Sequence, residues 1–370
     1  MRRGARHSKR SAALLLSVAG LVTWSAMPSQ VGGPAAWAAS PSSVGSSASE
    51  LTDVVCPTVR ACEAVGTNRS NTLGIVFGTT DGGLHWQRQT VPGGILGISP
   101  LTCPSATTCE AVASTNSLTM VIRTTNGGHT WVSQKLPPGV PIDAISCPTV
   151  SVCEGVGNSA ALRTANGGTS WTRQHVSAVV YSLADIACPR VTACEALGWT
   201  SGFNPLGIVF GTSNGGATWR SQHIPTKQSP AAISCPSSTT CEIALSPPFF
   251  GGPASVQALR TTDGGATWEQ QSIVDGVVAS GISCPVPNTC EAVGGTFISY
   301  VAVRTTDGGS TWSLQALPSP SSSKTLEAHD VACPAVNTCV LVGSLVSGPS
   351  SVGATARTTD GGKTWSISLP

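Results

Sequence analysis

Fourteen cysteines carry the clearest chemistry in this sequence, because every one belongs to a Cys-Pro-x-x-x-x-Cys unit. Thiols at a fixed spacing can form disulfides or bind zinc. Zinc motifs favour ligands two to four residues apart, and no histidine recurs beside these units. An even count at one spacing therefore favours structural disulfides without a redox role. The pairs are Cys56 with Cys62, Cys103 with Cys109, Cys147 with Cys153, Cys188 with Cys194, Cys235 with Cys241, Cys284 with Cys290, and Cys333 with Cys339.

Glutamates form the second recurrent set. They follow the second cysteine in six of the seven units, at Glu63, Glu110, Glu154, Glu195, Glu242 and Glu291. A ring of carboxylates could bind a cation or a polyol. The alternative is an ion pair across neighbouring strands with the arginines at Arg123, Arg163, Arg260, Arg304 and Arg357. We favour the ion pair in the second, third, fifth and sixth units, although it leaves Glu63 and Glu195 without that partner.

A third set is an acid or its amide in front of two glycines, with tryptophan following after two further residues. Its members are Asp81, Asn126, Asn166, Asn214, Asp263, Asp307 and Asp360. Asp-Gly and Asn-Gly are strong hairpin signals, because the turn needs residues that tolerate a positive φ. An amide cannot act as a general acid, so the exchange of Asp for Asn indicates a structural turn. We predict no catalytic residue, no metal site and no cofactor.

The spacing of the seven tryptophans shows which elements hold these residues. Trp86, Trp131, Trp171, Trp219, Trp268, Trp312 and Trp365 lie 45, 40, 48, 49, 44 and 53 residues apart, which is typical of propeller blades. The sequence predicts an all-β, seven-bladed β-propeller of four-stranded antiparallel blades, with one disulfide per blade. The expected blades are residues 51–93, 94–138, 139–179, 180–226, 227–275, 276–319 and 320–370.

The unit Thr-Thr-Asp-Gly-Gly-x-Thr-Trp, as at residues 305–312, resembles the Asp-box or BNR repeat. That repeat occurs in sialidases, sortilin-type receptors, xyloglucan-degrading enzymes and photosystem II assembly and stability factors. The whole unit is most similar to the last of these, and the cysteine pair departs from that family's usual blade. The resemblance covers about 320 residues. It implies a propeller that serves as a binding scaffold.

The first 38 residues have the basic start, apolar run and small-residue site of a signal peptide, and residues 39–50 read as a linker. An uncleaved membrane anchor is the alternative. Five of the 20 Lys and Arg residues lie in this leader and none of the 18 Asp and Glu residues does. The rest is slightly acidic without a basic cluster, which argues against nucleic acid as a partner. We expect a secreted or extracytoplasmic monomer with no membrane span after leader removal.

Function is expected where the copies differ, on the face that carries the loops between second and third strands. Six aromatic residues fall in or beside those loops: Trp199, Phe203, Phe249, Phe250, Phe297 and Tyr300. They could bind a protein or glycan of the cell envelope, or pack under their own loops. We favour a binding propeller without catalytic activity. The alternative is a glycoside hydrolase of the Asp-box class, similar to a sialidase or xyloglucanase, which would need a carboxylate pair that the sequence does not show.

Overall fold

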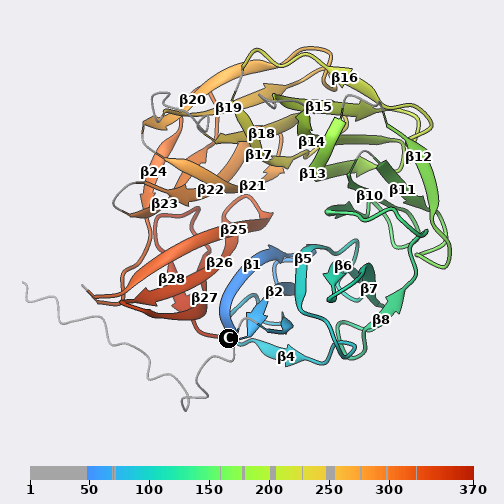
Figure 1. Cartoon of the computed structure of the whole chain (residues 1–370). Helices are drawn as coiled ribbons and strands as arrows, with labels where there is room; N and C mark the ends of the chain where they lie inside the picture. Colours follow the sequence, from blue (N-terminus) through green and yellow to red (C-terminus); the bar gives the residue numbers. More distant parts are fainter. Residues whose placement is uncertain are drawn as a thin grey trace, which may run out of the picture. The chain divides into compact units, whose positions relative to one another are not determined.

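The computed structural model describes residues 48–370 except 69, 71, 159, 177–179, 201–205, 227, 247–254, 276, 297–298 and 322. In this part, 28 strands form seven four-stranded antiparallel sheets, each built from four consecutive strands. The sheets follow one another around an axis (Figure 1). This confirms the predicted seven-bladed β-propeller. The predicted signal peptide lies outside the described residues, and no helix within them is long and apolar enough to cross a membrane.

Each blade runs from an inner strand to an outer one. The strands of blades one and two are β1 (Ala48–Val55), β2 (Cys62–Asn68), β3 (Gly74–Thr79), β4 (Gln87–Gln89), β5 (Gly97–Thr102), β6 (Cys109–Ser114), β7 (Thr119–Thr124) and β8 (Val132–Gln134). Those of blades three and four are β9 (Ala144–Ser146), β10 (Cys153–Gly157), β11 (Ala160–Thr164), β12 (Thr172–His175), β13 (Val180–Arg190), β14 (Ala193–Thr200), β15 (Gly207–Thr212) and β16 (Arg220–Gln222). Those of blades five to seven are β17 (Ser229–Ser234), β18 (Cys241–Ser246), β19 (Ser255–Thr261), β20 (Glu269–Asp275), β21 (Val278–Val286), β22 (Thr289–Gly295), β23 (Tyr300–Thr305), β24 (Ser313–Ala316), β25 (Thr325–Ala335), β26 (Thr338–Ser347), β27 (Ser350–Thr358) and β28 (Ser366–Ser368).

The second strands are apolar on both faces because each blade packs against two neighbours. Ala64 and Val65, adjacent in β2, are both fully buried although their side chains point to opposite faces. A glycine ends this buried run where the inner strand bulges. A Cβ on Gly66 would lie 2.0 Å from the carbonyl oxygen of Glu50, so only glycine fits there without a backbone shift.

The hydrophobic core consists of seven clusters, each between two adjacent blades. In one of them Val65 and Val76 of blade one pack against Ile98, Ile122 and Trp131 of blade two. Burial of large apolar side chains is the main favourable contribution to folding, and here it joins blades rather than filling single sheets. The blade is therefore stable only beside its neighbours.

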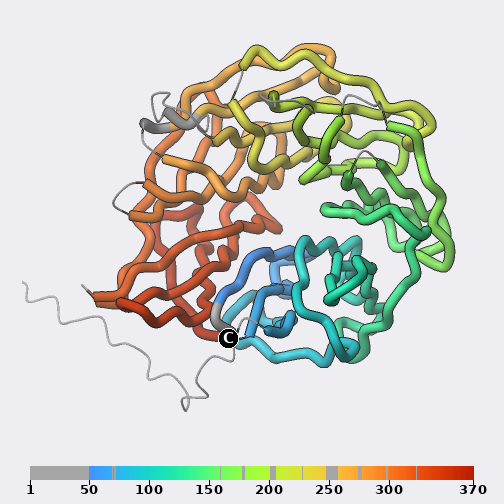
Figure 2. Tube along the Cα trace, viewed as in Figure 1, coloured from blue at the N-terminus to red at the C-terminus, as the bar shows by residue number. Residues whose placement is uncertain are grey.

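The first and last blades close the ring by the same kind of packing. Leu51 and Phe77 of blade one share a core cluster with Ala332 and Val342 of blade seven, and the two blades lie side by side in Figure 2. Within the described residues each blade is built from its own four consecutive strands, the first and last blades included. The inner strand of blade one starts at Ala48, so the last three residues of the predicted linker belong to the propeller.

The seven predicted disulfides are all present, and no cysteine is unpaired. Each joins the end of an inner strand to the second strand of the same blade, with Cα atoms 4.0 to 4.1 Å apart. Closing so short a loop contributes about 2 kcal/mol per bridge in the chain-entropy model. The bridges also indicate an oxidising compartment outside the cytoplasm.

Candidate functional site

The Asp-box turns form a framework with the cysteine turns. In blade two the hydroxyl of Thr124 donates to Oδ1 of Asn126 at 3.0 Å and accepts the N–H of Gly128 at 3.0 Å. Gly127 and Gly128 have φ of 67° and 81°, which other residues rarely adopt. The N–H of Gly127 donates to the carbonyl of Thr107 in the cysteine turn at 2.9 Å. Both kinds of turn therefore lie on one face, as the alternating strand direction predicts.

Asp and Asn are interchangeable in this turn because a neighbouring threonine hydroxyl donates a hydrogen bond to Asp and accepts one from Asn. In blade five the hydroxyl of Thr267 donates to Oδ2 of Asp263 at 2.6 Å. In blade two Nδ2 of Asn126 instead donates to the hydroxyl of Thr130 at 3.0 Å. In both blades the backbone N–H of that threonine donates to Oδ1. The bonds around Asp263 lower its pKa to about 2, so its carboxylate is fully used by the turn.

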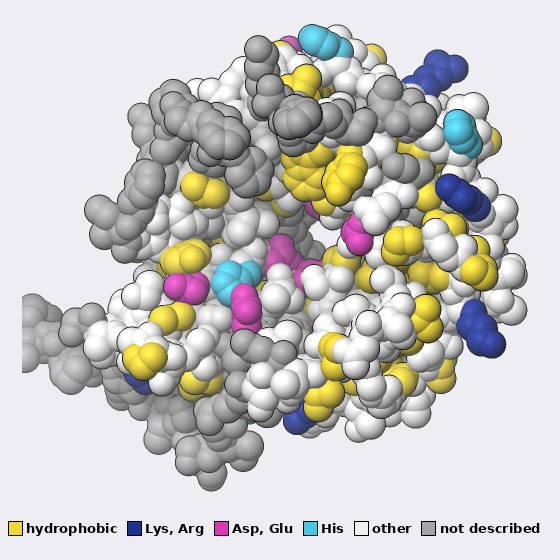
Figure 3. Space-filling model, viewed as in Figure 1, with side chains coloured by type: hydrophobic (Ala, Val, Ile, Leu, Met, Phe, Trp, Pro, Cys, Tyr) yellow, Lys and Arg dark blue, Asp and Glu magenta, His cyan; other side chains and the backbone are white. Residues whose placement is uncertain are grey.

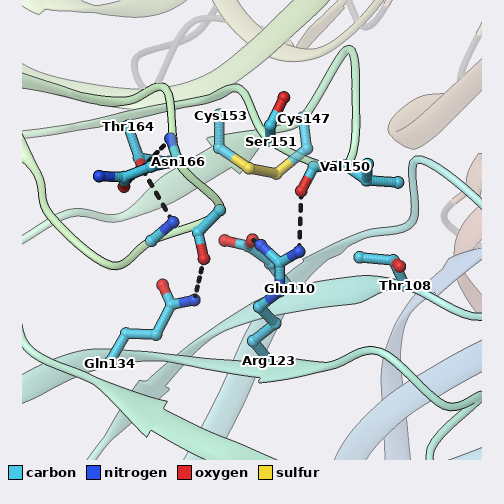
Figure 4. Close-up of polar contacts among 12 residues, drawn as sticks. Thr108, Glu110, Arg123, Gln134, Cys147, Val150, Ser151, Cys153, Thr164 and Asn166 are labelled. Carbon is cyan, nitrogen blue, oxygen red and sulfur yellow. Dashed lines mark hydrogen bonds and ion pairs between the residues drawn. A yellow bond between two sulfur atoms is a disulfide. The ribbon is translucent and has the colours of Figure 1, made fainter.

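The glutamates of blades two, three, five and six form the favoured ion pairs. Their partners are Arg123, Arg163, Arg260 and Arg304 respectively. In Figure 4, Arg123 lies against Glu110, with Nη1 and Oε1 2.6 Å apart, and its Nη2 donates to the carbonyl of Val150 in blade three at 2.8 Å. The nearby Cys147 and Cys153 are bonded to each other and offer no thiolate to a metal. These arginines therefore connect a glutamate of their own blade with a backbone carbonyl of the next blade.

Blades one and four use glutamine where the arginine is replaced by glycine. Nε2 of Gln89 donates to Glu63 at 3.0 Å, and Nε2 of Gln222 donates to Glu195 at 2.8 Å. The same glutamines accept the indole N–H of the next blade's tryptophan, at 2.8 Å for Trp131. The sequence holds a signal for them that the repeat comparison missed: glutamine stands three residues after the repeat tryptophan in six blades, and Ser368 in the seventh.

Burial shifts the titration of these glutamates. Desolvation raises the pKa of Glu63 to about 7 and that of Glu195 to about 8, and the glutamine bond offsets only part of the effect. Desolvation also dominates where arginine is the partner, and it raises the pKa of Glu291 to about 8. All six glutamates lie inside the framework, away from the solvent-facing loops.

The inner strands of all seven blades line a central cavity of about 370 Å³, here called the channel. Three aspartates line it at equivalent positions, three residues before the first cysteine of blades one, four and seven. Each accepts a backbone N–H from the next blade: Asp53 from Leu101 at 2.6 Å, Asp185 from Ile233 at 2.9 Å, and Asp330 from Val54 at 3.0 Å. The last of these bonds joins blade seven to blade one.

The other four junctions use a hydroxyl directly before the first cysteine. The N–H of the next blade's cysteine donates to it: Cys147 to Thr102, Cys188 to Ser146, Cys284 to Ser234, and Cys333 to Ser283, at 3.0 to 3.2 Å. Blades with the aspartate have Val55, Ala187 or Ala332 at this position. Every junction therefore has one side-chain acceptor, at one of two positions. Repeat comparison missed both sets because neither residue type recurs in all seven copies.

Two of the channel aspartates, Asp53 and Asp330, lie in contact with each other. The carboxyl groups of Asp53 and Asp330 hydrogen-bond to each other, and removal from bulk water raises the pKa of both, that of Asp330 further through the charge of Asp53. Desolvation likewise raises the pKa of Asp185 to about 6. Two carboxyls in contact disfavour each other's ionisation, which adds to the effect of burial.

A second cavity, of about 320 Å³, lies between blades six and seven at the loop end, and we call it the inter-blade pocket. Its walls come from the start of β21, the end of β22, the start of β23 and β25. They comprise Val278, Ala279, Ser280, Gly295, Thr296, Tyr300, Ala328 and His329. Nδ1 of His329 lies 2.9 Å from the carbonyl oxygen of Leu51 and 3.4 Å from the carboxylate of Glu50.

Charge is separated between the axis and the periphery. In Figure 3 acidic side chains gather around the central opening together with a histidine, whereas lysine and arginine lie toward the outside. Burial and the charges of Glu327 and Glu50 raise the pKa of Tyr300, which lines the pocket. Among the described residues, no lysine or arginine lines the channel or the pocket. The mouth of the channel is therefore electronegative.

Two of the six predicted aromatic binding residues lie in the described part. Tyr300 is half-buried, lines the inter-blade pocket and packs against the core of blade seven. Trp199 is also half-buried at the end of β14, and its indole N–H has no hydrogen-bond partner among the described residues. Phe203, Phe249, Phe250 and Phe297 lie outside the described residues, so the predicted aromatic surface stays a prediction. His329, Glu50 and Glu327 were not predicted as a group, because they come from opposite ends of the sequence.

Seven complete four-stranded blades around a channel define the protein as a seven-bladed β-propeller. No family model matches the sequence, and no curated protein matches it. Among solved structures, the chain is similar to YCF48 bound to a D1 peptide, with 15% identity and a TM-score of 0.59 over 81% of this chain and 90% of that one. It is similar to YCF48 from Cyanidioschyzon merolae, with 16% identity and a TM-score of 0.55 over 81% and 94%. It is also similar to the GH74 enzyme of Niastella koreensis, with 12% identity and a TM-score of 0.60 over 88% and 67%. At these identities the likeness shows the fold alone.

Proposed function

We propose that this protein is a non-catalytic binding scaffold that recognises a protein of the cell envelope through the loop face of its propeller. One observation carries this proposal: the recurrent polar residues are committed to the framework, whereas acidic side chains gather around the central opening and an inter-blade pocket with Tyr300 in its wall is left open. Side chains that serve every blade keep the shape, and only the exceptions can distinguish one partner from another.

The proposed compartment follows from the disulfides and the leader. Seven bridges in one chain persist in an oxidising environment. The basic and apolar leader would direct export and be removed after Ala38, which leaves the propeller as a secreted or extracytoplasmic monomer.

Two of the structural neighbours differ in what they do. One is a YCF48 structure with a bound D1 peptide, which supports a peptide-binding role for this fold. The other is a GH74 enzyme, which keeps glycoside hydrolysis as the alternative. Hydrolysis needs a carboxylate pair exposed to a sugar, with one acid free to donate a proton. The recurrent glutamates are held by arginine or glutamine, which favours binding over hydrolysis.

The test is capture of envelope proteins from the producing organism on the immobilised protein, with identification by mass spectrometry. We expect one specific partner that is lost when Phe249, Phe250 and Phe297 are replaced by Ser. The matched control replaces three exposed apolar residues on the outer strands and Asp-box face, Leu84, Val132 and Leu314, by Ser. Capture that survives in the loop variant, or is lost in the control, contradicts the proposal.

A second measurement addresses the alternative directly. The purified protein is incubated with a panel of plant and bacterial glycans, and released reducing ends are counted. We expect none above a heat-treated sample. Turnover that saturates with substrate would replace the binding proposal by a hydrolase.

A further inference from the structure

The walls of the inter-blade pocket suit an aliphatic chain. Val278, Ala279 and Ala328 supply apolar surface, and the ring of Tyr300 forms one side against Gly295, where a Cβ would lie 3.3 Å from the ring. The cavity of about 320 Å³ is at the lower end of the range for small-ligand sites. A cavity of this volume has room for one long side chain.

The rim of the pocket suits a positive charge. Glu50 has 44% of its side chain exposed, and its Oε1 lies 3.4 Å from Nδ1 of His329. The charge of Glu327, like that of Glu50, raises the pKa of Tyr300. In the described part no lysine or arginine lines either cavity, and the imidazole of His329 is the one basic group in the pocket wall. An anionic occupant would be repelled.

Lysine and arginine combine both requirements in one side chain. Their methylene stems pack on apolar surface while the charged head reaches carboxylates. A cation near the ring of Tyr300 would also gain from the ring's negative face. A small free amine would fill the rim and leave the apolar walls uncovered.

We propose that the inter-blade pocket binds a single lysine or arginine side chain of the partner protein, with its stem against Tyr300, Val278 and Ala328 and its cationic head between Glu50 and Glu327. This rests on the proposed function and names the chemistry that the partner presents. The partner segment is therefore basic, and it approaches the propeller from the loop face at the junction of blades six and seven.

The test uses defined probes and the purified full chain. Acetylated and amidated pentapeptides of alanine carry lysine, arginine, norleucine or glutamate at the centre, and binding is followed by saturation-transfer NMR. We expect the lysine and arginine peptides to bind at least about tenfold more tightly than norleucine, and the glutamate peptide to show no transfer. Raised salt should weaken the basic peptides, because an ion pair at a rim is screened.

Substitutions test whether Glu50 and Glu327 bind the cationic head of the peptide side chain. The double variant Glu50→Gln and Glu327→Gln should bind the lysine peptide about tenfold more weakly. The matched control Glu269→Gln removes an exposed carboxylate on β20 and should change nothing. All are surface exchanges of equal shape, and an unchanged thermal midpoint confirms folding.

Equal binding of norleucine and lysine, unchanged binding in the double variant, or the lack of transfer from any basic peptide would overturn the inference. The proposed function fails separately. If the envelope partner is captured equally by the wild type and the Glu50 and Glu327 double variant, the scaffold role stands and the pocket assignment falls.

Discussion

Blades one and four solve the same structural problem as blades two, three, five and six with different side chains. Where the latter hold a buried glutamate with arginine, the former use Gln89 or Gln222. Where the latter join the next blade through a serine or threonine hydroxyl, the former use Asp53 or Asp185. The contacts that a blade needs are fixed, but the residues that make them are not.

The two sets alternate along the ring with a period of three blades. Blades one and four even share the strand Gly-Ile-Val-Phe-Gly-Thr, at residues 74–79 and 207–212. Blade seven mixes the sets, with Asp330 at its junction and Val340 in place of the glutamate. Blade seven also closes the ring and forms one wall of the inter-blade pocket, so the blade that departs most from the pattern lies at the proposed site.

Removing the arginine from a blade that pairs its buried glutamate with arginine should have the largest effect on stability. Glu291 is fully buried and Arg304 is 8% exposed, with Nη1 and Oε2 3.0 Å apart. At about pH 9 the carboxyl is ionised, so Arg304→Ala should lower the free energy of unfolding by about 3 to 5 kcal/mol, because a buried charge loses its partner. The double variant Arg304→Met with Glu291→Leu should recover most of this loss in urea unfolding. A loss below about 1 kcal/mol in the single variant would show that the pair is not part of the framework.

A blade that holds its glutamate with glutamine should gain stability when that glutamate loses its charge. Burial raises the pKa of Glu63 from 4.5 to about 7, so the folded state binds its proton more tightly than the unfolded state does. Its stabilising contribution is complete below about pH 4.5 and is lost as the pH rises through 7. Glu63→Gln should therefore stabilise the protein on the order of 3 kcal/mol at about pH 9 and have little effect at about pH 5.

The control for that prediction is the same substitution in an arginine blade. Burial raises the pKa of Glu110 to about 7 as well, but Glu110→Gln also takes the anion away from Arg123, whose side chain is 13% exposed, so the gain in stability at about pH 9 should be smaller than for Glu63→Gln. Urea unfolding at both pH values measures the two variants. If they raise stability by the same amount at about pH 9, the two blade types are not distinct in their electrostatics.

The sequence predicted what every copy repeats and missed what only some copies carry. Strand order, disulfides and turns follow from invariant residues such as Gly127 and Trp131, and the Glu110 to Arg123 pair follows from neighbouring strands of one blade. The junction acceptors were not predicted, because Asp185 and Ser146 differ in residue type and position although each accepts a backbone N–H from the next blade. The pocket was hidden because tertiary closure alone brings residues near 50 and 329 together.

Exchanging one junction type for the other is the sharpest test of the comparison and should have the smallest effect. Asp185→Ala leaves the backbone N–H groups of Ile186 and Ile233 without their acceptor, and should cost about 1 to 2 kcal/mol. Adding Ala187→Ser places a hydroxyl where Ser146 stands in blade three, within reach of the N–H of Cys235, and should recover about 1 kcal/mol. The single variant Ala187→Ser is the control, and it should change stability little because Asp185 already holds the junction. Since the two positions lie on the same strand two residues apart, their side chains point to the same side, and rescue is expected only if blades truly share one contact with two solutions. A double variant no more stable than Asp185→Ala would mean that each blade depends on its own residue and that the period of three blades has no structural meaning.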